Sequence, residues 1–265
     1  MKKYQTKKRF GQHFLHDNNV INQIISVIRP KADDNVVEIG PGLGALTFPL
    51  LSHLEHIQLI EIDRDIIARL RALEDPRITI HPTDALKVDL STLTSTEHSL
   101  RIVGNLPYNI STPLIFHLLE SGHFIVDMHF MLQKEVVDRM VAVPNSKTYG
   151  RLSVMVQYLC QVDALFNVPK GAFSPPPKVE SAVVSLRPWR KSPYSKTDFS
   201  TLSMLVNQAF MKRRKTVRNA LKEVLTGEQI EQAGIDPSLR PENLRVEDFV
   251  QLSLAVPQDK LGEQG

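Results

Sequence analysis

A glycine-rich turn, Glu38–Gly44 (EIGPGLG), directly follows a short apolar run, and this junction constrains the fold more than any other feature of the chain. The run Asn35–Ile39 has the length and β-branched composition of a buried strand. Glycines at the end of a strand allow a sharp turn into a helix and let a ligand approach the backbone closely. The junction therefore predicts a strand–turn–helix unit that opens an α/β domain, with a ligand site at the turn.

The alternation of short apolar runs with helical periodicity continues through the first two-thirds of the chain. The predicted strands are Asn35–Ile39, Ile57–Ile62, Ile78–Ile80, Leu100–Val103 and Asp127–Leu132, and the predicted helices are Val20–Ile28, Leu43–Leu54, Asp65–Leu73, Thr112–Leu119, Lys134–Val141 and Leu152–Cys160. Two further strands, Ala164–Val168 and Ser181–Leu186, follow without an intervening helix, which predicts an antiparallel edge pair. We therefore expect a Rossmann-like α/β fold: a doubly wound, mostly parallel seven-stranded sheet with helices on both faces.

The strand pattern ends at a proline-containing break, Pro188–Pro193. Only helical patterns remain beyond it, at Phe199–Leu225, Glu228–Ala233 and Val246–Leu254. We therefore expect an α/β domain over residues 1–190 and a small all-α domain over residues 191–265, which ends in a loose polar tail.

Carboxylates after the next two strands indicate which ligand the glycine turn holds. Gly40 and Gly42 lie in the turn, and Glu61 ends the second strand about 20 residues on, where a carboxylate commonly binds ribose hydroxyls. Asp84 follows the third strand and can accept a hydrogen bond from an adenine amino group. Because the turn lacks the G-x-G-x-x-G spacing of dinucleotide sites, the pattern favours S-adenosylmethionine over NAD. A tight turn that binds no ligand is the alternative.

A second motif, Asn105–Tyr108 (NLPY), ends the fourth predicted strand, which lies beside the first in a doubly wound sheet. Adenine N6 is a poor nucleophile because its lone pair is delocalised into the ring. The Asn105 amide oxygen and the Leu106 carbonyl, fixed by Pro107, can accept both N6 hydrogens and localise that lone pair. The Tyr108 ring offers a face on which the base can stack. The motif predicts methyl transfer to adenine N6, with a plain proline turn as the alternative.

A proline-rich segment, Phe173–Pro177 (FSPPP), supplies another aromatic ring on a stiff backbone. Chemistry on the edge of a base requires the base to leave its stack and enter a pocket with planar walls. We expect Phe173 to form the wall of this pocket that faces Tyr108. The alternative is a core phenylalanine in a rigid loop.

Positive charge is concentrated in two places, although the net charge is only +3. Five of the first nine residues are Lys or Arg, and Arg213, Arg214, Lys215 and Arg218 form a second cluster. Basic clusters on a weakly charged background indicate an anionic partner, of which nucleic acid is the commonest. A solvated helix surface is the alternative for either cluster.

The composition argues against several classes of protein. No apolar run is long enough for a transmembrane helix, and the basic N-terminus is not followed by the apolar stretch of a secretory signal. The nine histidines and the single cysteine, Cys160, show no metal-ligand spacing, so we expect no metal. Cys160 cannot form an internal disulfide, which fits a reducing compartment, and we expect a cytoplasmic protein without membrane contact.

Six motifs follow one another along the chain. They are Gln12–Leu15 (QHFL), Glu38–Gly44 (EIGPGLG), Asn105–Ser111 (NLPYNIS), Met131–Val136 (MLQKEV), Tyr149–Ser153 (YGRLS) and Phe173–Val179 (FSPPPKV). In this order they resemble the ribosomal RNA adenine dimethylase family, from about Phe10 to the C-terminal helices. The resemblance implies S-adenosylmethionine-dependent N6,N6-dimethylation of two adjacent adenosines in the 3′-terminal hairpin loop of small-subunit (16S) ribosomal RNA, and a role in small-subunit maturation.

The resemblance also implies roles for individual residues. Cofactor contacts would fall on His13, Leu15, Gly40, Glu61, Asp84 and Asn105, and contacts with the target adenine on Asn105, Leu106 and Tyr108. His13 stands where many members carry Asn, so a contact through its backbone is an alternative. The basic start and the segment Lys212–Arg218 would contact RNA phosphates in a salt-sensitive interaction. We expect a monomer whose helical domain binds the RNA, within a pre-assembled small subunit.

Three other functions remain open from the sequence. A large-subunit ribosomal RNA adenine methylase that confers antibiotic resistance would share the catalytic motifs. A DNA adenine methylase usually carries Asp/Asn-Pro-Pro-Tyr, whereas Leu106 replaces the first of those prolines here. The third is a binding factor on the methylase fold, such as an assembly checkpoint, against which the intact glycine turn and carboxylates argue.

Overall fold

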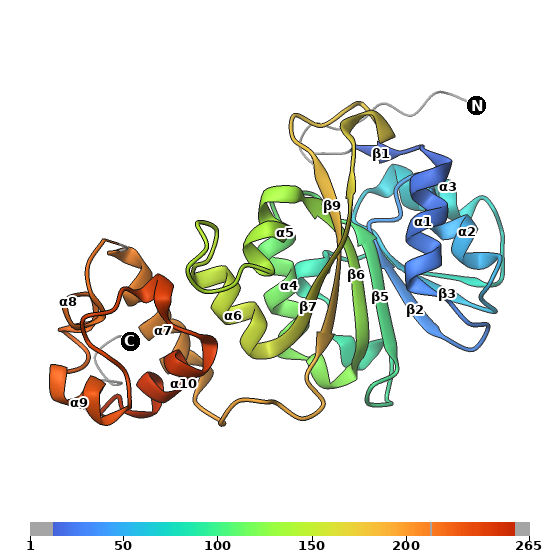
Figure 1. The fold of residues 1–265 in the computed structure, drawn as a ribbon. Coiled ribbons are helices and arrows are strands. Elements are labelled where there is room, and N and C mark those ends of the chain that lie inside the picture. Colours follow the sequence, from blue (N-terminus) through green and yellow to red (C-terminus); the bar gives the residue numbers. More distant parts are fainter. Residues whose placement is uncertain (1–12, 213, 258–265) are drawn as a thin grey trace. The chain divides into compact units, whose positions relative to one another are not determined.

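The computed structural model describes residues 13–212 and 214–257. The chain forms two units: the first runs up to Val137 and includes Asp163–Pro188, and the second comprises Asp138–Val162 and the chain from Trp189 onwards (Figure 1). The second unit thus includes the segment 138–162 besides the helices expected after residue 190. Among the described residues, no helix combines the length and the apolar character needed to cross a membrane.

The first unit is built on a seven-stranded sheet in the order β4-β3-β2-β5-β6-β9-β7. Its strands are β2 (Asn35–Ile39), β3 (Ile57–Ile60), β4 (Ile78–His81), β5 (Leu100–Asn105), β6 (Ile125–Gln133), β7 (Cys160–Val168) and β9 (Ser181–Pro188). Strands β4, β3, β2, β5 and β6 pair in parallel, whereas β9 pairs antiparallel to β6. The expected doubly wound sheet is confirmed, and its strand order reverses between β2 and β5.

Five helices lie on both sides of the sheet in Figure 1, and α2, α3 and α4 among them connect parallel strands. They are α1 (Asn18–Ile28), α2 (Thr47–Leu51), α3 (Arg64–Arg71), α4 (Ser111–Glu120) and α5 (Lys134–Met140), with short 3₁₀ turns η2 (Ala85–Lys87), η3 (Leu90–Thr92), η4 (Gly122–Phe124) and η5 (Lys170–Ala172). Helix α1 begins where the Asp17 carboxylate accepts bonds from the backbone N–H groups of Asn19 and Val20. Its buried positions recur with helical period, so one face packs on the sheet.

Two very short strands, β1 (Phe14–Leu15) and β8 (Phe173–Ser174), form a separate antiparallel pair. Phe14 lies opposite Ser174 and Leu15 opposite Phe173. The His16 N–H donates to the Ala172 carbonyl at 2.9 Å and continues the pairing. This pair attaches the beginning of the described chain to the loop before β9, and the sequence pattern did not indicate it.

The second unit contains helices α6 (Arg151–Leu159), α7 (Phe199–Met211), α8 (Val217–Leu221), α9 (Gly227–Gln232) and α10 (Val246–Leu254), with a 3₁₀ turn η6 (Pro241–Asn243). Its core includes three aromatic rings, in which Phe210 lies between Tyr149 and Phe249 with ring centroids 6.1 and 5.6 Å apart. Tyr149 and Phe249 are fully buried, so this unit has a hydrophobic core of its own.

Two predicted helices are shorter in the structure than in the sequence pattern. The helix expected over Phe199–Leu225 is broken, because the Thr216 side chain accepts from the Asn219 N–H and begins a new helix at Val217. The helix expected from Leu43 begins only at Thr47, because the preceding glycine turn continues to Leu46. Both differences come from local backbone chemistry that hydrophobic periodicity does not report.

A network around Arg101 joins β5, β6 and the residue before β2 at the end of the sheet opposite the glycine turn. Its guanidinium donates to Asp34 at 2.6 Å, to Asp127 at 2.8 Å and to the Ile28 carbonyl at the end of α1. The three charged side chains are 13–19% exposed. Losing the cation would leave two largely buried carboxylates without compensation.

We expect Arg101→Met to lower the free energy of unfolding by about 3 kcal/mol, measured by urea denaturation. Arg77→Met is the control, because Arg77 forms a similar pair with Asp75 at 2.7 Å but its side chain is 48% exposed. Solvent screens such a pair, so this variant should unfold close to the wild-type urea concentration. Equal midpoints for the two variants would contradict the structural importance of the Arg101 network.

Candidate active site

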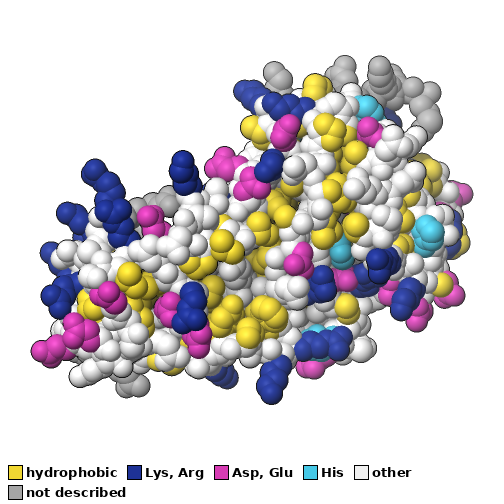
Figure 2. Space-filling view, viewed as in Figure 1, with side chains coloured by type: hydrophobic (Ala, Val, Ile, Leu, Met, Phe, Trp, Pro, Cys, Tyr) yellow, Lys and Arg dark blue, Asp and Glu magenta, His cyan; other side chains and the backbone are white. Residues whose placement is uncertain are grey.

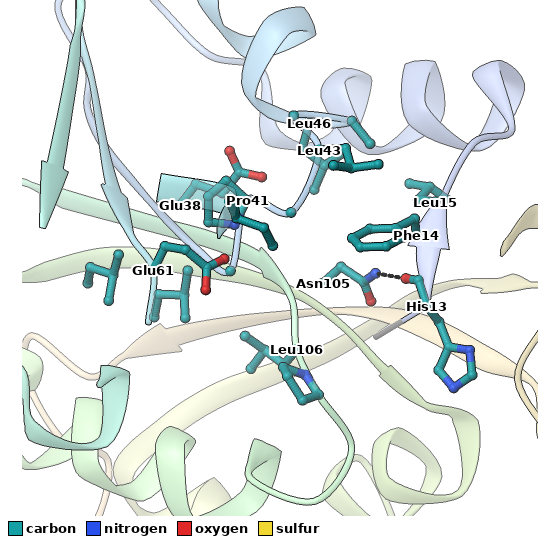
Figure 3. Close-up of a pocket in the computed structure, with 18 of the residues that line it drawn as sticks. His13, Phe14, Leu15, Glu38, Pro41, Leu43, Leu46, Glu61, Asn105 and Leu106 are labelled. Atoms are coloured by element: carbon teal, nitrogen blue, oxygen red, sulfur yellow. Dashed lines mark hydrogen bonds between the residues drawn. The ribbon is translucent and has the colours of Figure 1, made fainter. Parts of the chain in front are cut away.

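A cavity of about 1400 Å³ lies outside the carboxyl ends of β2, β3 and β5. Side chains and backbone from all three strand ends line it, as Figure 3 shows for the labelled residues. The predicted site residues that line this cavity are His13, Leu15, Gly40, Gly42, Glu61, Asp84, Asn105, Leu106, Pro107 and Tyr108. The glycine turn and the Asn105 motif, far apart in the chain, therefore meet at one place.

Two glycines of the turn, Gly40 and Gly42, share a backbone conformation that favours glycine but have different surroundings. Gly40 and Gly42 both have positive φ angles, +68° and +55°, which side chains rarely adopt. A Cβ at Gly42 would lie 3.1 Å from the Phe14 ring, so β1 packs directly on the turn. A Cβ at Gly40 would meet nothing within 4 Å. Gly40 therefore presents bare backbone to open space, as a cofactor cradle requires.

Glu61 is held at the end of β3 by backbone donors. Its Oε1 accepts from the N–H groups of Ile62 and Asp63, both at 2.8 Å, and the Gly42 backbone also bonds to its carboxylate. Burial raises the pKa of Glu61, although these bonds favour the ionised form. The glycine turn and the carboxylate thus fix each other. In Figure 3 the carboxylate points toward the Asn105 side of the cavity.

Glu38 is a second buried carboxyl group behind the turn, 2% exposed. The Thr47 hydroxyl donates to its Oε2 at 2.6 Å. Burial raises the pKa of Glu38 to about 7, against the opposing effect of the Thr47 bond, and the nearby Glu61 charge adds to the increase. Glu38 therefore changes charge near neutral pH.

Asn105 ends β5 with its side-chain amide held in one orientation. Its Nδ2 donates to the backbone carbonyl of His13 at 3.0 Å, shown as a dashed line in Figure 3. A carbonyl can only accept, so the amide nitrogen must face His13 and the oxygen must face away. The amide thereby offers an acceptor from the cavity wall, as the methyl-transfer hypothesis requires.

Tyr108 is fixed at both its hydroxyl and its ring. The hydroxyl forms a 2.8 Å hydrogen bond with the hydroxyl of Ser181, which is fully buried at the start of β9. The ring lies beside His13, with centroids 6.0 Å apart and planes inclined by 28°. Burial raises the Tyr108 pKa. The phenol therefore presents a neutral, oriented ring at the cavity.

Phe173 does not have the position that the sequence indicated. Its side chain is 3% exposed and belongs to the hydrophobic core with Leu15 and Val183, and it does not line the cavity formed by the described residues. Leu15 and Phe173 lie opposite each other in β1 and β8, and both side chains are buried in this core. The structure thus favours the alternative of a core phenylalanine, and Ser174 and Pro175 face the cavity instead.

The basic cluster lies in the second unit, at the turn between α7 and α8. Arg214, Lys215 and Arg218 are exposed, while Arg213 lies outside the described residues, as do the basic residues at the start of the chain. Arg218 is 3.6 Å from Glu231 in an exposed pair. Figure 2 shows Lys and Arg side chains gathered over the region of α8. Within residues 13–212 and 214–257 no group of three or more His, Cys, Asp or Glu side chains could hold a metal ion.

Sequence reasoning missed several residues that shape the site. Phe14 packs on the glycine turn, Ser181 anchors Tyr108, and the Pro175 carbonyl bonds to the His13 ring at 2.8 Å. Phe14 lies inside the QHFL motif and could have been considered. Ser181 and Pro175 act across more than 70 residues, and nothing in their local sequence indicates these partners.

Solved structures define the class of this fold. The crystal structure of a dimethyladenosine transferase from Plasmodium falciparum matches with a TM-score of 0.77 at 29% identity, covering 91% of this chain and 96% of that one. The 23S rRNA methyltransferase ErmE matches with a TM-score of 0.71 at 24% identity, covering 92% of this chain and 100% of that one. The chain has the Rossmann-like methyltransferase fold with an additional helical region.

Sequence comparison narrows the class to a family. Residues 3–257 match the family model described as ribosomal RNA adenine dimethylase. "Ribosomal RNA small subunit methyltransferase A" of Acinetobacter baylyi is 56% identical, covering 94% of this chain and 92% of the relative. The protein of the same name from Hydrogenovibrio crunogenus is 53% identical, covering 98% of this chain and 100% of the relative. This chain belongs to the ribosomal RNA adenine dimethylase family.

The raised pKa of Glu38 makes stability depend on pH. Between its ordinary value of 4.5 and about 7, the folded protein retains a proton that the unfolded chain has released. Folding stability must therefore fall as pH rises through this window. Glu38→Gln keeps an acceptor for Thr47 but cannot ionise. Between pH 5 and pH 8 the free energy of unfolding of the wild type should therefore fall by roughly 2–3 kcal/mol relative to that of this variant.

Denaturant unfolding of both proteins at the two pH values measures this difference, and subtraction cancels the other titrating groups. Glu55→Gln, at an exposed position, should keep the wild-type pH dependence. Parallel pH profiles for the wild type and Glu38→Gln would show that Glu38 does not titrate in this window.

Proposed function

We propose that this enzyme transfers methyl groups from S-adenosylmethionine to N6 of two adjacent adenosines in the 3′-terminal hairpin loop of small-subunit ribosomal RNA, and so contributes to small-subunit biogenesis. The observation that carries the proposal is the orientation of Asn105, whose amide nitrogen is engaged by the His13 carbonyl while its oxygen stays available. The names of relatives with more than 50% identity support the small-subunit RNA as the substrate.

The residues around the cavity fit S-adenosylmethionine. Gly40 presents bare backbone to open space, and Glu61 offers a fixed carboxylate for ribose hydroxyls. Asp84 accepts from the Leu86 N–H at 3.0 Å, so its carboxylate is also fixed and could accept from an adenine amino group. We assign the remaining cofactor contacts to His13, Leu15, Gly42 and Asn105. The bound cofactor supplies a methyl group activated by its sulfonium.

The protein's own contribution is to hold and orient the target adenine. Asn105 Oδ1 and the Leu106 carbonyl would accept the two N6 hydrogens, and Pro107 restricts the backbone that carries the second acceptor. The Tyr108 ring, anchored through Ser181, would stack on the base, worth roughly 1–3 kcal/mol. Orientation and proximity then supply most of the rate enhancement. Ordinary ligand pockets have volumes of up to about 1,000 Å³. The cavity, at about 1400 Å³, is larger and leaves room for the cofactor and the base together.

We assign phosphate binding to Arg213, Arg214, Lys215 and Arg218, and with it an RNA-binding role to the helical region. The exposed Arg218–Glu231 pair is weak enough to exchange its partner for a phosphate. We further propose that the enzyme acts as a monomer on a pre-assembled small subunit in the cytoplasm. A reducing compartment suits the single buried cysteine, Cys160.

The large-subunit methylase is the nearest alternative function. The similarity to ErmE supports the shared fold alone at 24% identity. The test is to supply labelled cofactor and unmodified RNA as small-subunit particles, large-subunit particles or naked small-subunit RNA, and to map the labelled nucleotide. Label on N6 of two adjacent adenosines in small-subunit particles supports the proposal, whereas label confined to large-subunit RNA refutes it.

Asn105→Ala and Glu61→Ala should affect different steps. Losing the amide acceptor should reduce kcat roughly 100- to 1000-fold, because a preorganised polar contact to the reacting group disappears. Losing the Glu61 carboxylate should weaken cofactor binding roughly 10-fold or more, since a charged hydrogen-bond acceptor is removed. Single-turnover rates and calorimetry with S-adenosylhomocysteine separate the two effects. Full activity of Asn105→Ala would refute the proposed N6 contact.

Replacing Arg213, Arg214 and Lys215 by Gln should weaken RNA binding and flatten its salt dependence. Each lost phosphate contact should reduce the slope of log K against log salt by roughly 0.7–0.9. Binding titrations at several salt concentrations measure this slope. The control replaces Lys31, Arg71 and Lys191, three exposed cations elsewhere, by Gln. If both triple variants change the slope equally, the cluster is no specific phosphate site.

A further inference from the structure

The backbone of His13 faces Asn105 because of its place next to β1. In an extended strand, successive residues direct their N–H and C=O groups to opposite sides. The His16 N–H bonds to Ala172, so residues 14 and 16 direct their backbone groups toward β8. His13 and Leu15 must direct theirs to the other side. The His13 carbonyl thereby points away from β8 and accepts from Asn105 Nδ2 at 3.0 Å.

The His13 side chain is tied to a second element. Its Nδ1 lies 2.8 Å from the Pro175 carbonyl, which can only accept, so Nδ1 carries the hydrogen and donates it. Its ring lies 6.0 Å from the ring of Tyr108 in a nearly parallel orientation. One residue thus contacts Asn105 through its backbone, Tyr108 through its ring and the β8 segment through its ring nitrogen.

The pairing that holds β1 in place is very short. Strands β1 and β8 contribute only two residues each, and a two-stranded ribbon alone is marginally stable. The bond from His13 to Pro175 adds a fixed point directly beside the carbonyl that orients Asn105. Pro175 has no N–H with which to donate, and the backbone groups of His13 face away from β8, so the bond between these two residues uses the His13 side chain.

We propose that His13 is a positioning residue for methyl transfer, whose imidazole, anchored on the Pro175 carbonyl, keeps its own backbone carbonyl in the place that orients the Asn105 amide. This role rests on the proposed function for its catalytic consequence and is distinct from a cofactor contact. Without the anchor, the carbonyl moves and the amide turns, although every backbone atom is still present. A displacement of this kind costs rate more than affinity.

Three substitutions at His13 separate the effect of its hydrogen-bond donor from the effect of its ring. His13→Ala removes both, His13→Phe keeps a ring without a donor, and His13→Asn keeps a donor without the ring. We expect kcat to fall roughly 10-fold in the first two and to stay close to wild type in His13→Asn, with the KM for RNA little changed in all three. His53→Ala, at an exposed position, is the matched control.

A second measurement needs neither cofactor nor RNA. In protein labelled with ¹⁵N-asparagine, the side-chain NH₂ signals of Asn105 are identified by their loss in Asn105→Ala, and their hydrogen exchange is followed by NMR. Exchange should accelerate in His13→Ala and His13→Phe and remain slow in His13→Asn and His53→Ala. Circular dichroism verifies that each variant is folded.

Unchanged exchange in His13→Ala, or faster exchange with unchanged kcat, would overturn the positioning role. The positioning role would also be overturned if His13→Asn did not show wild-type kcat and wild-type exchange of the Asn105 amide, because a donor to Pro175 would then not suffice. If the wild type itself transfers no methyl group to adenine, the proposed function fails, while the exchange experiment still decides whether His13 orients the amide.

Discussion

The reversal of strand order between β2 and β5 is the constraint on which the site depends. Strands β3 and β4 continue the sheet on one side of β2, and β6 continues it on the other side of β5. The connections that leave these two strands therefore diverge, and a crevice opens between them. The glycine turn follows β2 and the Asn105 motif ends β5. Two motifs far apart in sequence become the two sides of one cavity.

The two sides of this cavity differ in their electrostatics. Two buried carboxyl groups, Glu38 and Glu61, lie on the side of β2 and β3, where burial raises both pKa values. The β5 side offers the Asn105 amide and the Tyr108 phenol, which carry no charge at neutral pH. A cationic sulfonium would be favoured beside the carboxyl groups, whereas a neutral base meets neutral partners. The arrangement would fit transfer of a methyl group from a cationic sulfonium, which leaves as a neutral thioether, to an uncharged nitrogen.

Much of this could be predicted from sequence, and the failures have physical causes. The buried strand Asn35–Ile39 and the amphipathic helix Val246–Leu254 have the predicted bounds. The β1–β8 pair was missed because two-residue strands have no periodicity to detect. The same pairing accompanies burial of the Phe173 ring in the hydrophobic core, whereas the sequence had predicted that this ring forms a wall of the base pocket. Thr216 carried a capping signal that was overlooked when a single helix was predicted over Phe199–Leu225.

The contact with His13 explains why residue 105 is an asparagine. The His13 carbonyl requires a donor on one side of this side chain, and the proposed contact with adenine N6 would require an acceptor on the other. Aspartate would place a carboxylate oxygen against the carbonyl, and a longer glutamine would not keep the oxygen at the same distance from β5. Only a short amide satisfies both neighbours. The orientation of the Asn105 amide is thus set by the backbone of His13, next to β1, so the position of the proposed acceptor is a property of the fold before any substrate binds.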